Sequence, residues 1–153
     1  MCEMQKMKNT VNEDVTVIAI YLPNAAEIPF EKNRELLLIQ YQRFFKICHD
    51  IMIQETRCRD FIVYNHYIYG IFNGHCDDIV KIIASRINVR LQEVIYGRTN
   101  YPEQLIYGMG IATGGAVLLS FDNISRKLIN NIWLGSVFDK AFIQAQKDLD
   151  KIY

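Results

Sequence analysis

The chain has 153 residues, of which 50% are hydrophobic and 22% are charged. This size and composition predict one globular domain with a hydrophobic core of its own. Lys and Arg number 17, the same as Asp and Glu. This balance argues against a dedicated nucleic-acid binder, because such proteins usually carry a basic excess. A net charge near zero also removes self-repulsion and favours association.

Neither a membrane span nor a signal peptide is predicted. The longest apolar runs, such as residues 15–22 and 114–121, are too short to cross a bilayer. Residues 1–15 contain no apolar stretch of the kind that a secretory signal needs. We therefore expect a cytosolic (cytoplasmic) protein with free thiols, and we expect Cys48 to lie in the core of a helix.

The N-terminal part predicts an arm, a strand and a helix. Residues 1–13 are polar and are expected to form a flexible arm before a single domain over residues 14–153. Residues 15–22, "VTVIAIYL", form a β-branched apolar run that is typical of a central strand covered on both faces. Residues 32–55 repeat apolar side chains at three- and four-residue steps, as a helix does, and Asn33 is a candidate cap.

A hairpin and a second helix follow. Residues 61–74 carry aromatic and β-branched side chains in both arms and predict a hairpin with a tight turn at Asn65 and His66. Residues 77–97 predict an amphipathic helix. Residues 75–78, His-Cys-Asp-Asp, are all metal-ligating types, but adjacent residues do not easily point at one ion. We interpret them as the start of the helix.

The last third predicts a second hairpin and a closing helix. Residues 103–121 are expected to turn at or near Gly114 and Gly115. A short apolar piece at 132–135 leads into a helix over residues 136–153. This order of elements favours an α+β sandwich with a mostly antiparallel sheet and the helices on one face.

Two short motifs lie in this last third. Residues 110–114 are Gly-Ile-Ala-Thr-Gly, and residues 133–135 are Trp-Leu-Gly, followed by a helix with a small residue at Ala141. Together with the element order over residues 15–146, they resemble the catalytic domain of the class III adenylate and guanylate (nucleotidyl) cyclases. The order and spacing support the resemblance more strongly than the short motifs do. It implies the nucleotidyl-cyclase (ferredoxin-like) sandwich.

The resemblance also implies a reaction and the groups that it needs. In that family, two divalent ions activate the ribose 3′-oxygen for attack on the α-phosphorus, and carboxylates hold the ions. One aspartate ends the first strand, and another occupies the tip of the hairpin that follows. An Asn and an Arg on the closing helix orient the ribose and stabilise the transition state. The sites are built between two head-to-tail subunits.

This chain carries other residues at the matching positions. Tyr21 stands at the first aspartate, Asn65 at the hairpin glycine and His66 at the second aspartate. Asp139 stands at the Asn position of the closing helix, and Ile143 stands at the Arg position. Losses on three separate elements predict a degenerate site that binds no metal and has no assigned catalytic residue.

Four further residues around the hairpin and the last strand have expected roles. Ile62 and Ile132 stand at the base-selecting positions, and neither side chain reads a purine edge by polar contacts. Tyr64 and Tyr67 flank the hairpin tip and are candidates for an interface, since aromatic residues are enriched there. We interpret His66 as a polar residue at an exposed tip rather than as a metal ligand or general base.

The leading hypothesis is a catalytically degenerate cyclase-like domain that serves as a dimerising, regulatory or nucleotide-binding module. Its expected partner is a second copy or a related cyclase-like chain, and it needs no cofactor. Neither a membrane nor a nucleic acid is expected as a partner. Related domains usually continue into further strands, so we expect a shortened form or a fragment whose sheet edge needs covering.

Two alternatives stay open. The first is an active, divergent cyclase that uses Mg²⁺ or Mn²⁺ and makes a 3′,5′-cyclic nucleotide, including a pyrimidine one of the kind used in bacterial antiphage signalling. The second is an unrelated α+β interaction module.

Overall fold

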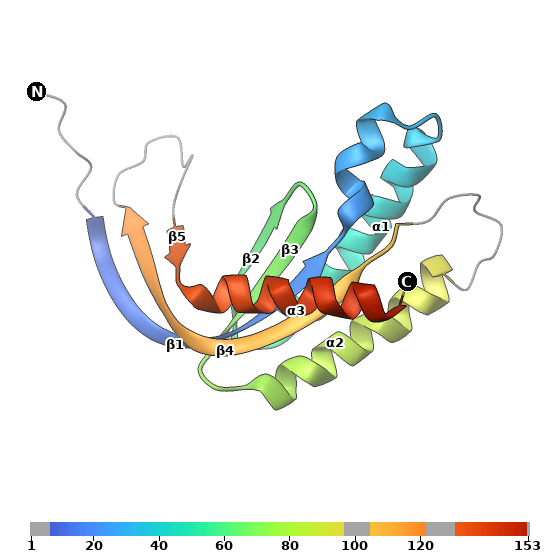
Figure 1. The fold of residues 1–153 in the computed structure, drawn as a ribbon. Helices are drawn as coiled ribbons and strands as arrows, with labels where there is room; N and C mark the ends of the chain where they lie inside the picture. The colour runs from blue at the N-terminus through green and yellow to red at the C-terminus, as the bar shows by residue number, and fades with distance from the viewer. Residues whose placement is uncertain (1–6, 97–104, 122–130, 153) are drawn as a thin grey trace, which may run out of the picture.

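The computed structural model describes residues 7–96, 105–121 and 131–152. Its strands are β1 Met7–Tyr21, β2 Cys58–Tyr64, β3 Tyr67–Asn73, β4 Gly108–Phe121 and β5 Asn131–Leu134. Its helices are α1 Arg34–Ile53, α2 Asp77–Leu91 and α3 Ser136–Ile152, with short helical segments η1 Pro23–Phe30 and η2 Gln92–Tyr96. The strands form one antiparallel sheet in the order β2-β3-β1-β4-β5 (Figure 1). The predicted α+β fold is confirmed.

The strand β1 lies at the centre of the sheet because both of its faces are apolar. Residues 15–20 are all fully buried. Side chains alternate along a strand, so Ile18 and Ile20 join the core under α1 and α2, whereas Val17 and Ala19 join the core under α3. The prediction of a central strand covered on both faces is confirmed.

The strand β4 corrects two predictions. Residues 103 and 104 lie outside the described part of the chain, and residues 108–121 form one continuous strand instead of a hairpin. Gly114 and Gly115 pair with β1, which is long enough to hold the glycines in an extended ladder. That ladder also includes residues 7–13, so this part of the predicted arm belongs to the sheet. The second hairpin exists further along the chain, as the antiparallel pair β4 and β5.

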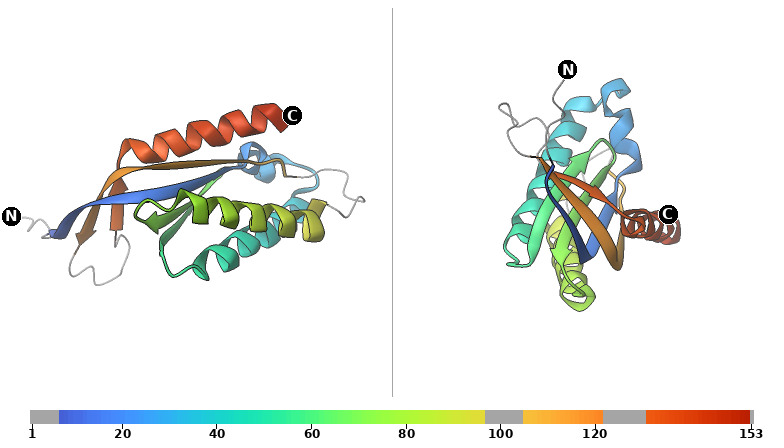
Figure 2. Two further views of the ribbon diagram at one scale, coloured as in Figure 1. Left: turned by 90° about the horizontal axis from the view of Figure 1, so that it is seen from below. Right: turned by 90° about the vertical axis from the view of Figure 1, so that its left-hand side faces the viewer.

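The helices lie on both faces of the sheet (Figure 2). In the left-hand view α3 lies above the sheet, while α1 and α2 lie below it. The expectation of helices on one face is therefore wrong for α3. Its small residues Ala141 and Ala145 approach Gly108 and Gly110 of β4 so closely that a Cβ on either glycine would overlap the helix backbone. None of the described helices is long and apolar enough to cross a membrane.

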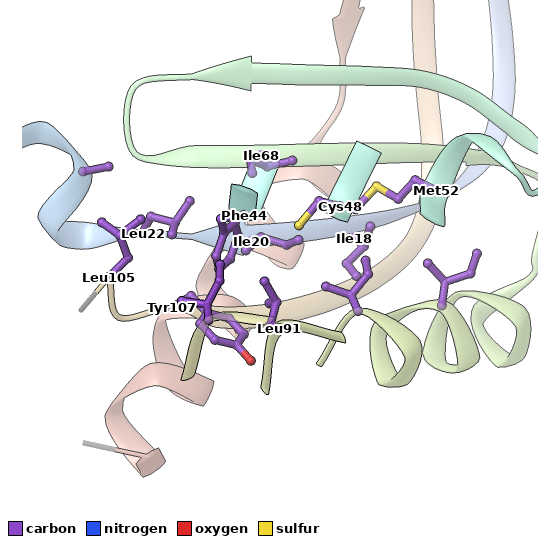
Figure 3. Close-up of a cluster of buried hydrophobic side chains, with 14 of the residues drawn as sticks. Ile18, Ile20, Leu22, Phe44, Cys48, Met52, Ile68, Leu91, Leu105 and Tyr107 are labelled. Atoms are coloured by element: carbon purple, nitrogen blue, oxygen red, sulfur yellow. The ribbon is translucent and has the colours of Figure 1, made fainter. Parts of the chain in front are cut away.

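The larger core lies between the sheet and the pair α1 and α2 (Figure 3). Phe44, Cys48 and Met52 of α1 are fully buried there, together with Ile18 and Leu91. The burial of Cys48 in a helix core is confirmed, and desolvation raises the pKa of its thiol well above the usual range. On this side of the sheet, large side chains such as Phe44 and Met52 are completely shielded from solvent.

Helix α2 begins within residues 75–78, which confirms the interpretation of this segment as a helix start. Cys76 occupies the cap position, and Asp77 and Asp78 lie in the first turn, where the helix N-terminus favours carboxylates. His75 lies outside the helix, and its Nε2 is 3.2 Å from Oδ2 of Asp14. Helix α1 likewise begins after Asn33 as predicted, although that side chain makes no capping hydrogen bond.

Candidate functional site

The tip of the β2–β3 hairpin lies beside the end of β1. Asn65 has a left-handed backbone with φ of 53°, which Asn tolerates better than most residues, and it forms the tight turn that the sequence predicts. The backbone N–H of Leu22 donates to the carbonyl oxygen of His66 at 2.7 Å. Tyr21 pairs directly with Tyr67 in the ladder between β1 and β3. These contacts place the His66 side chain next to Tyr21.

The rings of Tyr21 and His66 are in contact at this point. Their centroids are 5.6 Å apart and the ring planes meet edge to face at 79°. Phe142 of α3 lies 5.1 Å from the Tyr21 ring and 6.3 Å from the His66 ring. The Asn65 amide lies 3.0 Å from Nδ1 of His66 and donates to it. The two positions that the resemblance equates with metal-binding aspartates thus lie side by side, and an aromatic contact occupies them.

This contact is one end of a row of rings along the α3 side of the sheet. Successive centroid distances lie between 4.9 and 6.4 Å. We name as the aromatic row Tyr21, His66, Tyr67, Tyr69, Trp133, Phe138 and Phe142. All of its members are half-buried. Tyr67 and Tyr69 belong to the aromatic pattern of the hairpin, and the resemblance had singled out Tyr21, His66 and Trp133. Sequence reasoning missed Phe138, although its four-residue spacing to Phe142 on a helix was the available signal.

The other end of the aromatic row joins the two edges of the sheet. The indole Nε1 of Trp133, on β5, donates to Oδ2 of Asp60, on β2, at 3.0 Å. The second carboxylate oxygen, Oδ1, accepts the backbone N–H of Phe61 at 2.9 Å. The Arg59 guanidinium lies 5.8 Å from the centre of the Trp133 ring, and it also pairs with Glu13 at 2.7 Å. The curled sheet therefore brings its first and last strands together, and Asp60 has a partner for each oxygen.

Other predicted site residues lie along or beside the row. Asp139 is exposed on α3, and Ile143 is 47% exposed there. Burial raises the pKa of the Tyr69 phenol to about 12, with smaller contributions from the neighbouring Tyr67 phenol and from Asp139. Asp139 therefore lies near the middle of the row and not at the contact of Tyr21 and His66.

The remaining predicted positions are divided between the strands at the two edges. Ile62 of β2 packs against the core under α3 and pairs with Tyr69. Ile132 of β5 pairs with Leu119 of β4 and is half-buried. Tyr64 is 65% exposed, with its ring 5.8 Å from that of Tyr67. The hairpin tip thus presents Tyr64 to solvent beside the aromatic row.

The residues at the tip do not fit the ions that the resemblance implies. Mg²⁺ and Mn²⁺ prefer carboxylate and other hard oxygen ligands, whereas Tyr21 and His66 offer a phenol and an imidazole that pack against Phe142. Asp60 is engaged by Trp133 and by a backbone amide. Within the described ranges, no three His, Cys, Asp or Glu side chains are grouped as metal ligands are.

No model of a known protein family matches this sequence, and no curated protein matches it. Solved structures do match its fold. A bacterial light-regulated adenylyl cyclase superposes with a TM-score of 0.75 at 13% identity, over 91% of this chain and 41% of that one. The chain has a nucleotidyl-cyclase-like fold.

Two further structures agree with this cyclase-like architecture. A guanylyl cyclase superposes with a TM-score of 0.72 at 15% identity, over 94% of this chain and 73% of that one. A class III adenylyl cyclase-like ATP-binding protein from Pseudomonas aeruginosa gives 0.65 at 13% identity, over 96% of this chain and 34% of that one. The cyclase-like domain thus corresponds to less than half the length of two of these three proteins. The predicted resemblance is confirmed at the level of the fold.

Proposed function

We propose that this cyclase-like domain is not a nucleotide cyclase and that it acts as a pairing module. The observation that carries the proposal is the contact of Tyr21, His66 and Phe142 at the positions where the resemblance expects two carboxylates. Cyclisation in the manner of the resembled family needs divalent ions on the attacking oxygen and on the phosphates. A packed group of rings provides no ligand set for such ions.

The aromatic row is the surface that we assign to pairing. Its seven rings stay half-buried in the single chain, and Tyr64 beside it is 65% exposed. Tyrosine and other aromatic residues are enriched at protein interfaces, because they bury a large apolar area and lose little rotamer freedom. A second copy of this chain is the partner that we propose, and a related cyclase-like chain is the other partner that the resemblance implies.

Nucleotide binding without cyclisation is a second candidate. One structure of similar fold is described as an ATP-binding, cyclase-like protein. Half-exposed rings such as Tyr67 and His66 offer faces on which a base stacks. The same set of experiments tests this candidate, because binding and turnover are read separately.

The test of catalysis is an incubation of the purified protein with ATP, GTP, CTP and UTP in turn, with Mn²⁺ present. Mass spectrometry then reads any 3′,5′-cyclic product, and equilibrium dialysis reads binding of the unconverted nucleotide. We expect no cyclic product from any of the four. A product that disappears in His66→Ala or Asp139→Ala would overturn the proposal and identify the substrate.

The test of pairing is sedimentation velocity over a range of protein concentrations. We expect a dimer whose dissociation constant rises about tenfold in Tyr64→Ser, as loss of an aromatic interface residue commonly does. Ile82→Ser is the matched control, because Ile82 is 62% exposed on α2, away from the row. A wild-type chain that stays monomeric at all concentrations would contradict self-pairing.

A further inference from the structure

A second open surface lies on the opposite side of the sheet, between α1 and α2. It is a groove of about 900 Å³ that residues of both helices line. Its apolar lining consists of Ile47, Ile51, Ile82, Val89 and Val94. Ile82 is 62% exposed and Val89 is 59% exposed, and neither belongs to the buried stripe of α2, which is Val80, Ile83, Ile87 and Leu91. Folding of the single chain therefore leaves apolar side chains in this groove uncovered.

The rim of the groove is basic, although the whole chain has no net charge. Five cationic side chains line it, namely Arg43, Lys46, Lys81, Arg86 and Arg90, against the two carboxylates Asp50 and Glu93. Both carboxylates pair with a cation nearby in sequence, Asp50 with Lys46 at 3.0 Å and Glu93 with Arg90 at 3.2 Å. Lys81 pairs at 3.7 Å with Asp77, which lies outside the lining, so the cations outnumber the carboxylates by two when Asp77 is counted. Exposed pairs of this kind are weak. An acidic ligand would therefore meet a surplus of positive charge at little cost in lost ion pairs.

The spacing of the lining residues sets the size of a ligand. Between Ile82 and Val94 the chain advances twelve residues along a nearly continuous helical path, which corresponds to about 18 Å at about 1.5 Å per residue. This length accommodates about three turns of a partner helix. Ile47 and Ile51 lie one turn apart on α1, so the opposite wall offers a second apolar strip.

We propose that this groove docks an amphipathic helix of a partner protein, with an apolar stripe bordered by Asp and Glu. The apolar stripe would lie against the isoleucines and valines, in the helix-in-groove manner, and the carboxylates would meet Arg86 and the other rim cations, which favours fast and selective encounter. A flat bilayer fits less well, because it would touch the exposed Ile82 and Val89 without filling the space between the two helix walls. The inference does not rest on the proposed pairing, which uses the other face of the sheet.

The test uses a phage-displayed library of helical peptides selected against the intact protein. We expect enrichment of peptides with apolar residues at three- and four-residue spacing bordered by acidic residues. The affinity of a selected peptide, measured by fluorescence anisotropy, should fall about tenfold in Ile82→Ser and in Val89→Ser. It should also fall in Arg86→Gln and as salt rises from about 50 mM to about 300 mM. Phe30→Ser is the matched control and should bind as the wild type does, because Phe30 is 83% exposed on η1 and lies outside the groove lining and the aromatic row.

Three results would overturn the proposal. One is a selection that enriches no helical peptide, or that enriches peptides without acidic residues. Another is a selected peptide that binds Ile82→Ser and Val89→Ser as tightly as the wild type, while circular dichroism shows both variants folded. The third is co-sedimentation of the wild type, but not of these variants, with phosphatidylserine-containing vesicles, which would assign the groove to an anionic lipid surface instead.

Discussion

The two faces of the sheet use apolar side chains in different ways. Under α1 and α2, long side chains such as Phe44 and Met52 are fully buried, and the apolar residues left over lie outside, in the groove between the helices. Under α3, the fully buried residues include Ala141 and Ala145, and the large rings stay half-buried along the aromatic row. The first face therefore contributes most of the stability of the single chain, whereas the second leaves its largest apolar groups half-exposed, as the proposed pairing requires.

Paired truncations of one ring on each face give the largest expected difference. Phe44→Ala should lower the free energy of unfolding by about 4 kcal/mol, because it leaves a cavity in a closed core. Phe142→Ala should cost about half as much, since its ring is half-buried and the space opens towards solvent. Urea unfolding measured by circular dichroism compares the two variants. Equal losses would mean that the α3 face is as tightly closed as the other.

The close approach of α3 to β4 predicts the next effect. Gly110→Val should cost about 3 kcal/mol, because its side chain would overlap the backbone of Ala141 and Ala145 and push the helix off the sheet. The matched control is Gly115→Ala on the same strand, where the nearest heavy atom is 4.0 Å from the added Cβ. That control should change stability by less than about 0.5 kcal/mol. Similar losses in both variants would contradict a tight contact confined to the first part of β4.

The smallest expected effect is a pH dependence of the free energy of unfolding, which arises from Tyr69 in the middle of the aromatic row. The pKa of Tyr69 is raised to about 12 from an ordinary value of 10.0, mainly by burial. The unfolded chain therefore ionises this phenol at lower pH than the folded chain does. The stability that the neutral phenol contributes is complete below pH 10 and is lost as the pH rises towards 12.

Urea unfolding of the wild type and Tyr69→Phe, at about pH 9 and at about pH 11, isolates this contribution from the other tyrosines. The wild type should lose more stability than the variant between the two conditions. An identical loss in both proteins would show that the Tyr69 ring is not shielded from water.

The central strand and the first long helix could be predicted from the sequence, because both depend on the repeat of apolar residues over a short stretch of chain. The apolar run at residues 15–22 and the helical repeat of α1 follow from periodicity, which neighbouring residues determine. The predicted turn at Gly114 and Gly115 was wrong. A glycine pair favours a turn only when no long strand is available to pair with it, and here β1 pairs with both glycines. The face of the sheet on which α3 lies could not be predicted either. Its narrow stripe of small residues is compatible with both faces, and the close contact with Gly108 and Gly110 is visible only in the structure.

The candidate site likewise has a part that the sequence predicts and a part that depends on the three-dimensional fold. The resemblance supplied Tyr21 and His66, since each is reached by counting along one element. Their contact with Phe142, and the continuation of the row through Phe138, depend on how three elements meet in space. No pattern within a single element contains that information.

The hydrogen bond between Trp133 and Asp60 has a mechanical consequence. It joins residues 73 positions apart in the sequence, on the first and last strands of the sheet. A displacement of the β2–β3 hairpin therefore pulls on β5 and, through Gly135, on the start of α3. The hydrogen bond closes the curled sheet by joining its two edge strands, β2 and β5. A force applied to the hairpin can therefore reach the N-terminal end of α3 directly through β5, without passing through β3, β1 and β4.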